Sequence, residues 1–116
     1  MYKRQEFKYP DAWADINFWG NELTLHATDP NHKITSERHN VDMGNVTVPH
    51  FGVHLDAITF KNLKQRLIDK NIKFIDPPYV RFKGEDIEQE TMFLADPNGN
   101  CMEIKTMKNP NTLFKK

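Results

Sequence analysis

The sequence lacks several features that would place a protein in a class at once. It has a single cysteine, Cys101, so no disulfide can form within the chain. Basic and acidic residues are equal in number, and the resulting net charge of zero argues against a nucleic-acid binder. No apolar run is long enough to span a bilayer, and the charged N-terminus has no apolar stretch behind it, unlike a signal peptide. These absences favour a cytoplasmic protein, and 116 residues fit one domain with a modest core.

A short internal repeat is the most informative feature that the chain does have. Gly20–His26 and Gly99–Lys105 both open with Gly-Asn and continue with alternating apolar residues. Thr24 of the first copy falls where the second copy has Glu103. Repeats of this kind indicate a fold built from related modules. The exchange of threonine for glutamate predicts that the two modules share one site.

The residue pattern predicts an α+β domain with one main helix over residues 57–70. Asp56 can cap this helix, and Asn71 lies at its end, where a residue that tolerates positive φ is favoured. Residues 1–10 are interpreted as an arm, residues 28–47 as a long linking loop, and the tail from Asn109 as loose. Strands are expected over residues 11–19, 22–27, 48–55, 72–75, 90–95 and 101–107. Residues 79–82 are expected to continue the strand over 72–75.

Alternation along the strands separates an apolar face from a titratable face. The helix is expected to pack on Phe51, Val53, Met102 and Ile104. The opposite face then carries His50, His54, Glu103, Cys101 and, from the first repeat, His26. Two imidazoles and a carboxylate are the donors of a metal site with open positions. The alternative is that these are satisfied polar residues on a half-solvated sheet face.

The remaining titratable residues receive simpler interpretations. Cys101 is interpreted as a small buried residue and not as a nucleophile. His32 and His39 fall in the predicted loop and are expected to be exposed to solvent. Arg81 and Lys83, beside Tyr79, are candidates for binding an anionic ligand. Equally, they could form a charged edge strand that discourages pairing with other chains.

Several motifs taken together resemble a known superfamily. They are Val48–Leu55, Phe82–Glu85, Glu88–Gln89, Thr91–Leu94 and Asp96–Lys105. The set resembles the vicinal-oxygen-chelate superfamily, which includes glyoxalases, bleomycin-resistance proteins and extradiol dioxygenases, and is most similar to small bacterial members of unassigned substrate. The resemblance covers residues 11–27 and 48–107. It implies paired βαβββ modules that form a cupped mixed sheet around a divalent metal.

The resemblance assigns parts of the chain to the two modules. Residues 1–27 would be an incomplete first module, 48–108 a complete second module and 109–116 a tail. His50 and Glu103 match two of the family's metal-ligand positions. We expect the first module to lack its opening strand, its helix and the next strand, and so to supply only the last two strands of a module. The remaining ligand then has no counterpart, and we expect either a naturally short protein or a truncated start. His54 or His26 could stand in, although neither matches a family position.

Three functions follow from the resemblance. The first is a metal-dependent lyase or dioxygenase that uses Fe, Mn, Ni or Zn to bind neighbouring oxygens of a small substrate. The second is a non-catalytic binding module of the antibiotic-sequestering type. The last is a truncated relative without activity. In each case we expect a homodimer that binds a small molecule, and neither nucleic acid nor a membrane.

Overall fold

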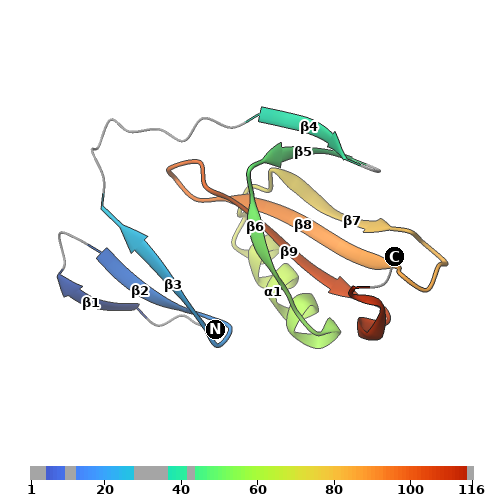
Figure 1. The fold of residues 1–116 in the computed structure, drawn as a ribbon, viewed down its shortest axis with the longest axis horizontal. Helices are drawn as coiled ribbons and strands as arrows, with labels where there is room; N and C mark the ends of the chain where they lie inside the picture. The colour runs from blue at the N-terminus through green and yellow to red at the C-terminus, as the bar shows by residue number, and fades with distance from the viewer. Residues whose placement is uncertain (1–4, 10–12, 28–36, 42–43, 115–116) are drawn as a thin grey trace. The chain divides into compact units, whose positions relative to one another are not determined.

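The computed structural model of the chain describes residues 5–9, 13–27, 37–41 and 44–114 (Figure 1). It divides into two units, Met1–His32 and Lys33–Lys116, and each is considered by itself. Within the described residues, no helix is long and apolar enough to cross a membrane.

The first unit is a three-stranded antiparallel meander of β1 (Gln5–Tyr9), β2 (Trp13–Phe18) and β3 (Asn21–His26). The two predicted strands and the Gly-Asn turn are confirmed. Trp19 and Gly20 have φ values of 50° and 88°, as a tight hairpin turn that follows the strand twist requires. The predicted N-terminal arm is wrong over residues 5–9, which form β1. Pairing with β2 allows this polar segment to form a strand without an apolar pattern of its own.

The second unit contains the predicted strand–helix–strand–strand–strand order. Its four-stranded sheet has the order β6-β9-β8-β7, in which β6 is parallel to β9 and the other pairs are antiparallel (Figure 1). The elements are β6 (Phe51–His54), helix α1 (Ala57–Asp69), β7 (Asp76–Arg81), β8 (Gln89–Ala95) and β9 (Cys101–Met107). The meander of β7, β8 and β9 has the same order as that of β1, β2 and β3, so the first unit supplies three strands of a module and not two.

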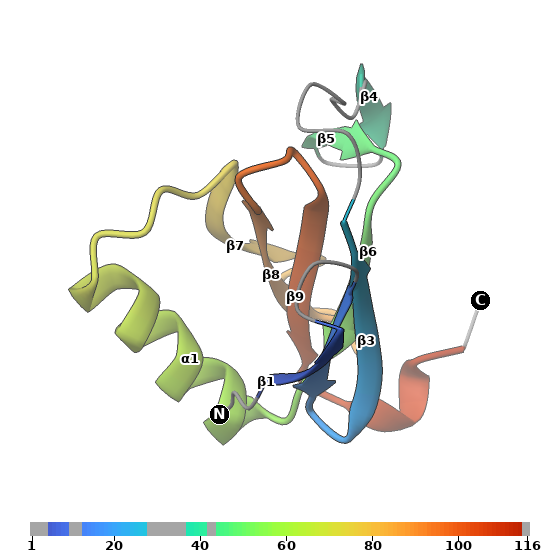
Figure 2. The same cartoon turned by 90° about the vertical axis from the view of Figure 1, so that its left-hand side faces the viewer.

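Helix α1 lies along one face of this sheet (Figure 2). Asp56 caps it by accepting a hydrogen bond from the Thr59 amide at 2.8 Å, and Asn71 adopts a φ of 56° at its end, as predicted. Phe60 is buried on the side of the helix that packs against β9, where Ile104 is also buried. Phe51 was expected to join this packing, but it remains 42% exposed because β6 is the edge strand of the sheet.

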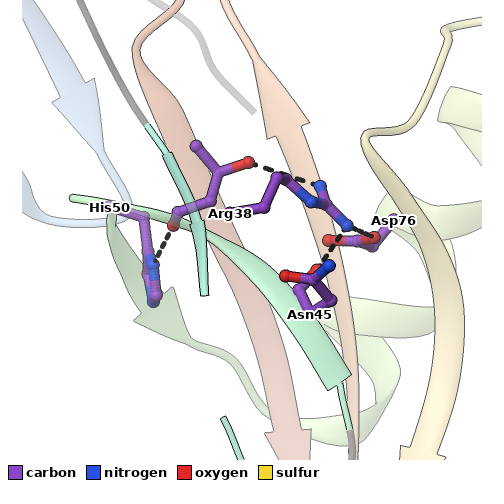
Figure 3. Close-up of polar contacts among 5 residues, drawn as sticks. Arg38, Asn45, His50 and Asp76 are labelled. Atoms are coloured by element: carbon purple, nitrogen blue, oxygen red, sulfur yellow. Dashed lines mark hydrogen bonds and ion pairs between the residues drawn. The ribbon is translucent and has the colours of Figure 1, made fainter. Parts of the chain in front are cut away.

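A second hairpin lies where the sequence predicts a loop. Strands β4 (Glu37–Val41) and β5 (Gly44–Val48) pair in antiparallel register, so the predicted loop over residues 28–47 is wrong for 37–41 and 44–47. The rest of that predicted loop lies outside the described residues. Arg38 joins the hairpin to β7 by an ion pair of 2.9 Å with Asp76, and it also donates to the Asn45 carbonyl (Figure 3).

Two further predicted boundaries change. The expected strand over 48–55 is divided, since β5 ends at Val48, a cis peptide bond precedes Pro49, and β6 begins at Phe51. The expected strand over 72–75 is wrong, because β7 starts at Asp76 and continues through two prolines, which an edge strand tolerates.

The end of the chain is more ordered than predicted. Pro110–Thr112 forms a short 3₁₀-helix in which Thr112 is buried, so this part of the tail is not loose.

Candidate metal and ligand site

His50 and Glu103 lie side by side in the second unit. His50 precedes β6 and Glu103 lies in the middle of β9, and Nε2 of the imidazole is 3.4 Å from Oε1 of the carboxylate. Their side chains are 26% and 17% exposed, so the pair is partly shielded but open to a small molecule. The structure therefore brings together the two residues that the sequence identifies as metal-ligand candidates.

The remaining nitrogen of His50 is held by the backbone. Nδ1 lies 2.8 Å from the carbonyl oxygen of Thr47, which can only accept, so Nδ1 carries the proton and donates (His50 is labelled in Figure 3). The imidazole ring also packs edge-on against Phe93, with ring centroids 5.1 Å apart. In the neutral ring, Nε2 is then left with a lone pair that points at Glu103. A hydrogen bond from the opposite nitrogen is the usual way in which proteins fix a metal-binding histidine.

The carboxylate of Glu103 is held in a comparable way. Oε2 accepts a hydrogen bond of 2.6 Å from the hydroxyl of Thr91, whose residue is 0% exposed. Gly52 is the neighbour of Glu103 across the parallel ladder, and a Cβ at Gly52 would lie 1.8 Å from the Glu103 carbonyl oxygen. Only glycine permits this approach of β6 to β9. Both functional side chains thus have one atom fixed and one atom presented to the same point.

Apolar side chains lie next to this pair. Val46 from β5, Phe93 from β8 and Cys101 from β9 form a buried cluster, against which Tyr79 packs. Burial raises the pKa of the Cys101 thiol and, more than any nearby charge, that of the Tyr79 hydroxyl. Cys101 is buried, as predicted. The titratable face is therefore less polar than expected, because the unpredicted hairpin contributes Val46 to it.

The histidines proposed as stand-in ligands have other neighbours within their own units. The described residues contain no group of three or more His, Cys, Asp or Glu side chains that could hold a metal. His54 is instead the ladder neighbour of Lys105, and burial followed by the Lys105 charge lowers the pKa of its imidazole. His26 belongs to the first unit, where it packs near Trp13 with ring centroids 6.2 Å apart. His39 is exposed beside Glu37, whereas His32 lies outside the described residues.

The three residues proposed for substrate binding have different positions. Tyr79 pairs with Thr91 in the β7–β8 ladder and so lies on the same sheet face as the pair. The Arg81 guanidinium stacks on Phe82 at 4.8 Å from the ring centroid. Lys83 is exposed in the following turn. Sequence reasoning missed Thr91 and Thr47, although Thr91 could have been identified as a polar residue in the otherwise apolar run Thr91–Leu94.

Comparisons with known proteins agree with this fold. No family model and no curated protein matches the chain. A crystal structure named glyoxalase/bleomycin resistance protein/dioxygenase, from Alicyclobacillus acidocaldarius, is similar with a TM-score of 0.71 and 28% identity, covering 96% of this chain and 77% of that one.

Two other solved structures match more weakly. One, named conserved domain protein, has a TM-score of 0.49 and 19% identity, over 92% of this chain and 75% of that one. The other, from the mobile metagenome of V. Pseudocholerae, has a TM-score of 0.44 and 16% identity, over 84% of this chain and 70% of that one. The likeness to the Alicyclobacillus protein confirms the resemblance to the vicinal-oxygen-chelate superfamily, with which the chain shares its glyoxalase-like α+β fold.

Proposed function

We propose that the chain binds a divalent metal through His50 and Glu103 and uses it to bind neighbouring oxygens of a small molecule. The observation that carries this proposal is the convergence of Nε2 and Oε1 at 3.4 Å. The opposite atoms of both side chains are already used, by the Thr47 carbonyl and the Thr91 hydroxyl. The two atoms without such a hydrogen bond, Nε2 and Oε1, are those that face each other.

The chemistry of the two donors fits a cation. A neutral imidazole nitrogen and a carboxylate oxygen both present lone pairs, and two acceptors at this distance repel unless a positive charge lies between them. A proton on Nε2 meets this need, and so does Mn²⁺, Fe²⁺, Ni²⁺ or Zn²⁺, all of which accept imidazole and carboxylate ligands. When bound, such an ion would act as a Lewis acid towards an oxyanion of the ligand.

The chain's own residues have separate tasks in this proposal. His50 and Glu103 hold the ion, and the two threonines hold their orientation. Phe93 and its cluster exclude water from one side. Because the described part of the chain offers only two donors, the remaining positions are filled by water, by ligand oxygens or by a group from outside these residues. We therefore expect weak metal binding in the absence of ligand.

Titration calorimetry with Ni²⁺, Mn²⁺ and Zn²⁺ tests the proposal. We expect Glu103→Ala and His50→Ala each to lower the affinity by tenfold or more, since each removes one of two donors. Glu90→Ala is the matched control, because Glu90 forms an ion pair with Lys64 and lies on the opposite face of the same sheet. Equal affinity in the wild-type protein and Glu103→Ala would exclude Glu103 as a ligand.

One observation favours the second candidate function, a binding module without catalysis. The described residues contain only two of the donors that a metal enzyme uses, and a protonated His50 would complete an ion pair with Glu103 unaided. In that case the small molecule would bind to the face formed by Phe93 and Tyr79. Metal analysis of the purified protein distinguishes the two, because a sequestering module of this kind would carry no stoichiometric metal.

A further inference from the structure

Lys105 lies on the same sheet face as Glu103, two residues further along β9. Alternation puts residues 103 and 105 on one side of the strand, and the ladder partners confirm it, since Gly52 faces Glu103 and His54 faces Lys105. On the other side, Thr91 is the partner of Lys105, and its hydroxyl binds Glu103. Lys105 is therefore part of the same surface as the candidate metal pair.

The ammonium group of Lys105 contacts an amide oxygen, and no carboxylate of the described residues neutralises it. Nζ lies 3.3 Å from the side-chain oxygen of Gln89, which is buried and whose amide nitrogen in turn donates to the Ile87 carbonyl at 3.3 Å. That second bond turns the oxygen of Gln89 towards the lysine. No carboxylate forms an ion pair with Lys105 among the described residues, and its own side chain is partly buried.

A lysine ammonium has three donors, and the contact with Gln89 uses one of them, so the group retains donors for an anion. The carboxylate of Glu103 does not serve this purpose, because the Lys105 side chain reaches Gln89 and forms no ion pair with Glu103. The ladder partner of Lys105, His54, is not an anion in either protonation state. An anionic group from a ligand would complete the surroundings of Lys105.

We propose that Lys105, positioned by Gln89, binds a second, anionic group of the ligand whose oxygens are chelated at His50 and Glu103. The inference deepens the proposed function and rests on it for the chelated end alone. Residues two apart on a strand are separated by about 7 Å, and Lys105 leans towards Gln89, away from Glu103. The preferred ligand is thus a small compound with neighbouring oxygens at one end and a carboxylate several bonds away at the other.

Two probes that differ only at the far end test this. α-Ketoglutarate and α-ketovalerate share the chelating 2-oxo acid group and chain length, but only the former has a distal carboxylate. Binding of each is measured by calorimetry with and without Mn²⁺, to the wild-type protein and to Lys105→Met. We expect the wild type to prefer α-ketoglutarate by about tenfold, the size of one charge-assisted contact, and Lys105→Met to lose that preference.

Three further variants keep the test decisive. Lys105→Arg should retain the preference because it retains the charge, and Lys61→Met, on the exposed surface of α1, should leave it unchanged. If Lys105→Met does not fold, Gln89→Glu provides a second test, because a carboxylate beside the ammonium would neutralise it and abolish the preference.

The two proposals fail in different ways. A preference for α-ketoglutarate that depends on Lys105 but not on Mn²⁺ would uphold the anion subsite and contradict the metal. Metal binding with equal affinity for both probes, or a preference that survives in Lys105→Met, would overturn the subsite and leave the metal proposal intact.

Discussion

At the scale of single residues, the site depends on the buried hydroxyl of Thr91. Thr91→Val keeps the shape of the side chain but leaves Oε2 of Glu103 without its donor. We expect a loss of about 1–3 kcal/mol in the free energy of unfolding, as for hydrogen bonds to charged groups, together with weaker Mn²⁺ binding. Chemical denaturation and calorimetry measure the two effects.

Thr106 provides a matched control for that substitution. Its hydroxyl is buried and has no hydrogen-bond partner within the described residues. Thr106→Val removes an unsatisfied polar atom, so it should be neutral or slightly stabilising and leave metal affinity unchanged. Equal losses in the two variants would show that the hydroxyl of Thr91 has no special role.

His54 predicts a pH dependence of stability. Burial and then the charge of Lys105 hold the pKa of His54 below its ordinary value of 6.5. As the pH falls through 6.5, the unfolded chain takes up a proton before the folded chain does, so stability is lost on acidification and is complete above that pH. His54→Gln should therefore be less sensitive to acid than the wild type, as measured by denaturation at several pH values. A difference between the two proteins that does not change with pH would contradict this, and His39→Gln is the control.

The candidate site could be predicted in part from individual residues. His50 and Glu103 follow from strand alternation and from the family resemblance, because both depend on local sequence alone. The partners that orient them could not be predicted, since Thr47 belongs to a hairpin that the polar composition of residues 37–47 concealed. Strand alternation also gives the face of Lys105, but the absence of an ion pair between Lys105 and any described carboxylate is a property of the packed structure.

At the scale of elements, the hairpin of β4 and β5 depends on Arg38. Its guanidinium reaches Asp76 of β7 at 2.9 Å and the carbonyl of Asn45 (Figure 3). Oδ2 of Asp76 is buried and has no hydrogen-bond partner among the described residues. Arg38→Met should cost about 1 kcal/mol, because the pair is partly exposed, and should speed hydrogen exchange in β5 more than in α1. His39→Ala, which alters an exposed pair on the same strand, should change neither. Uniformly faster exchange throughout the second unit would mean that Arg38 has no local role.

An element could be predicted where the residues that determine it lie within its own segment of the sequence. Helix α1 has its cap, its apolar stripe and its C-terminal Asn71 within one segment, and the structure confirms it. Strand β7 runs through Pro77 and Pro78, which normally argue against a strand, and its place at the sheet edge explains this. Strand β1 has no apolar pattern, so only its pairing with β2 identifies it.

At the scale of the whole molecule, we expect a homodimer. Strand β6 is an edge of its sheet, and the opposite edge, β7, contains two prolines that hinder pairing. A second copy pairing at β6 would form a closed two-fold assembly next to the candidate site. Light scattering at micromolar concentration should give about twice the 13.7 kDa of the chain, whereas a stable monomer of that mass would refute the expectation.

Two matched substitutions locate the dimer interface. Phe51 on β6 and Val80 on β7 are apolar and 42% and 41% exposed. Phe51→Lys should weaken the dimer because it places a charge on the paired edge, and Val80→Lys should not. If a partner chain completes the metal site, the candidate ligands are His26, His32 and His39. Alanine variants of these three, titrated with Ni²⁺, show whether any contributes.

The repeated meander has a consequence for folding. Strands β3 and β9 share the Gly-Asn turn at their start and the same apolar alternation. During refolding, β9 can therefore compete with β3 for pairing with β2. In the correct hairpin, Thr24 lies opposite Asp15, and its hydroxyl donates a hydrogen bond of 2.8 Å to the Asp15 carboxylate. If β9 took the place of β3 in the same register, Glu103 would lie opposite Asp15, and two facing carboxylates repel. The carboxylate that serves the site thus also discourages the exchange of one hairpin for the other.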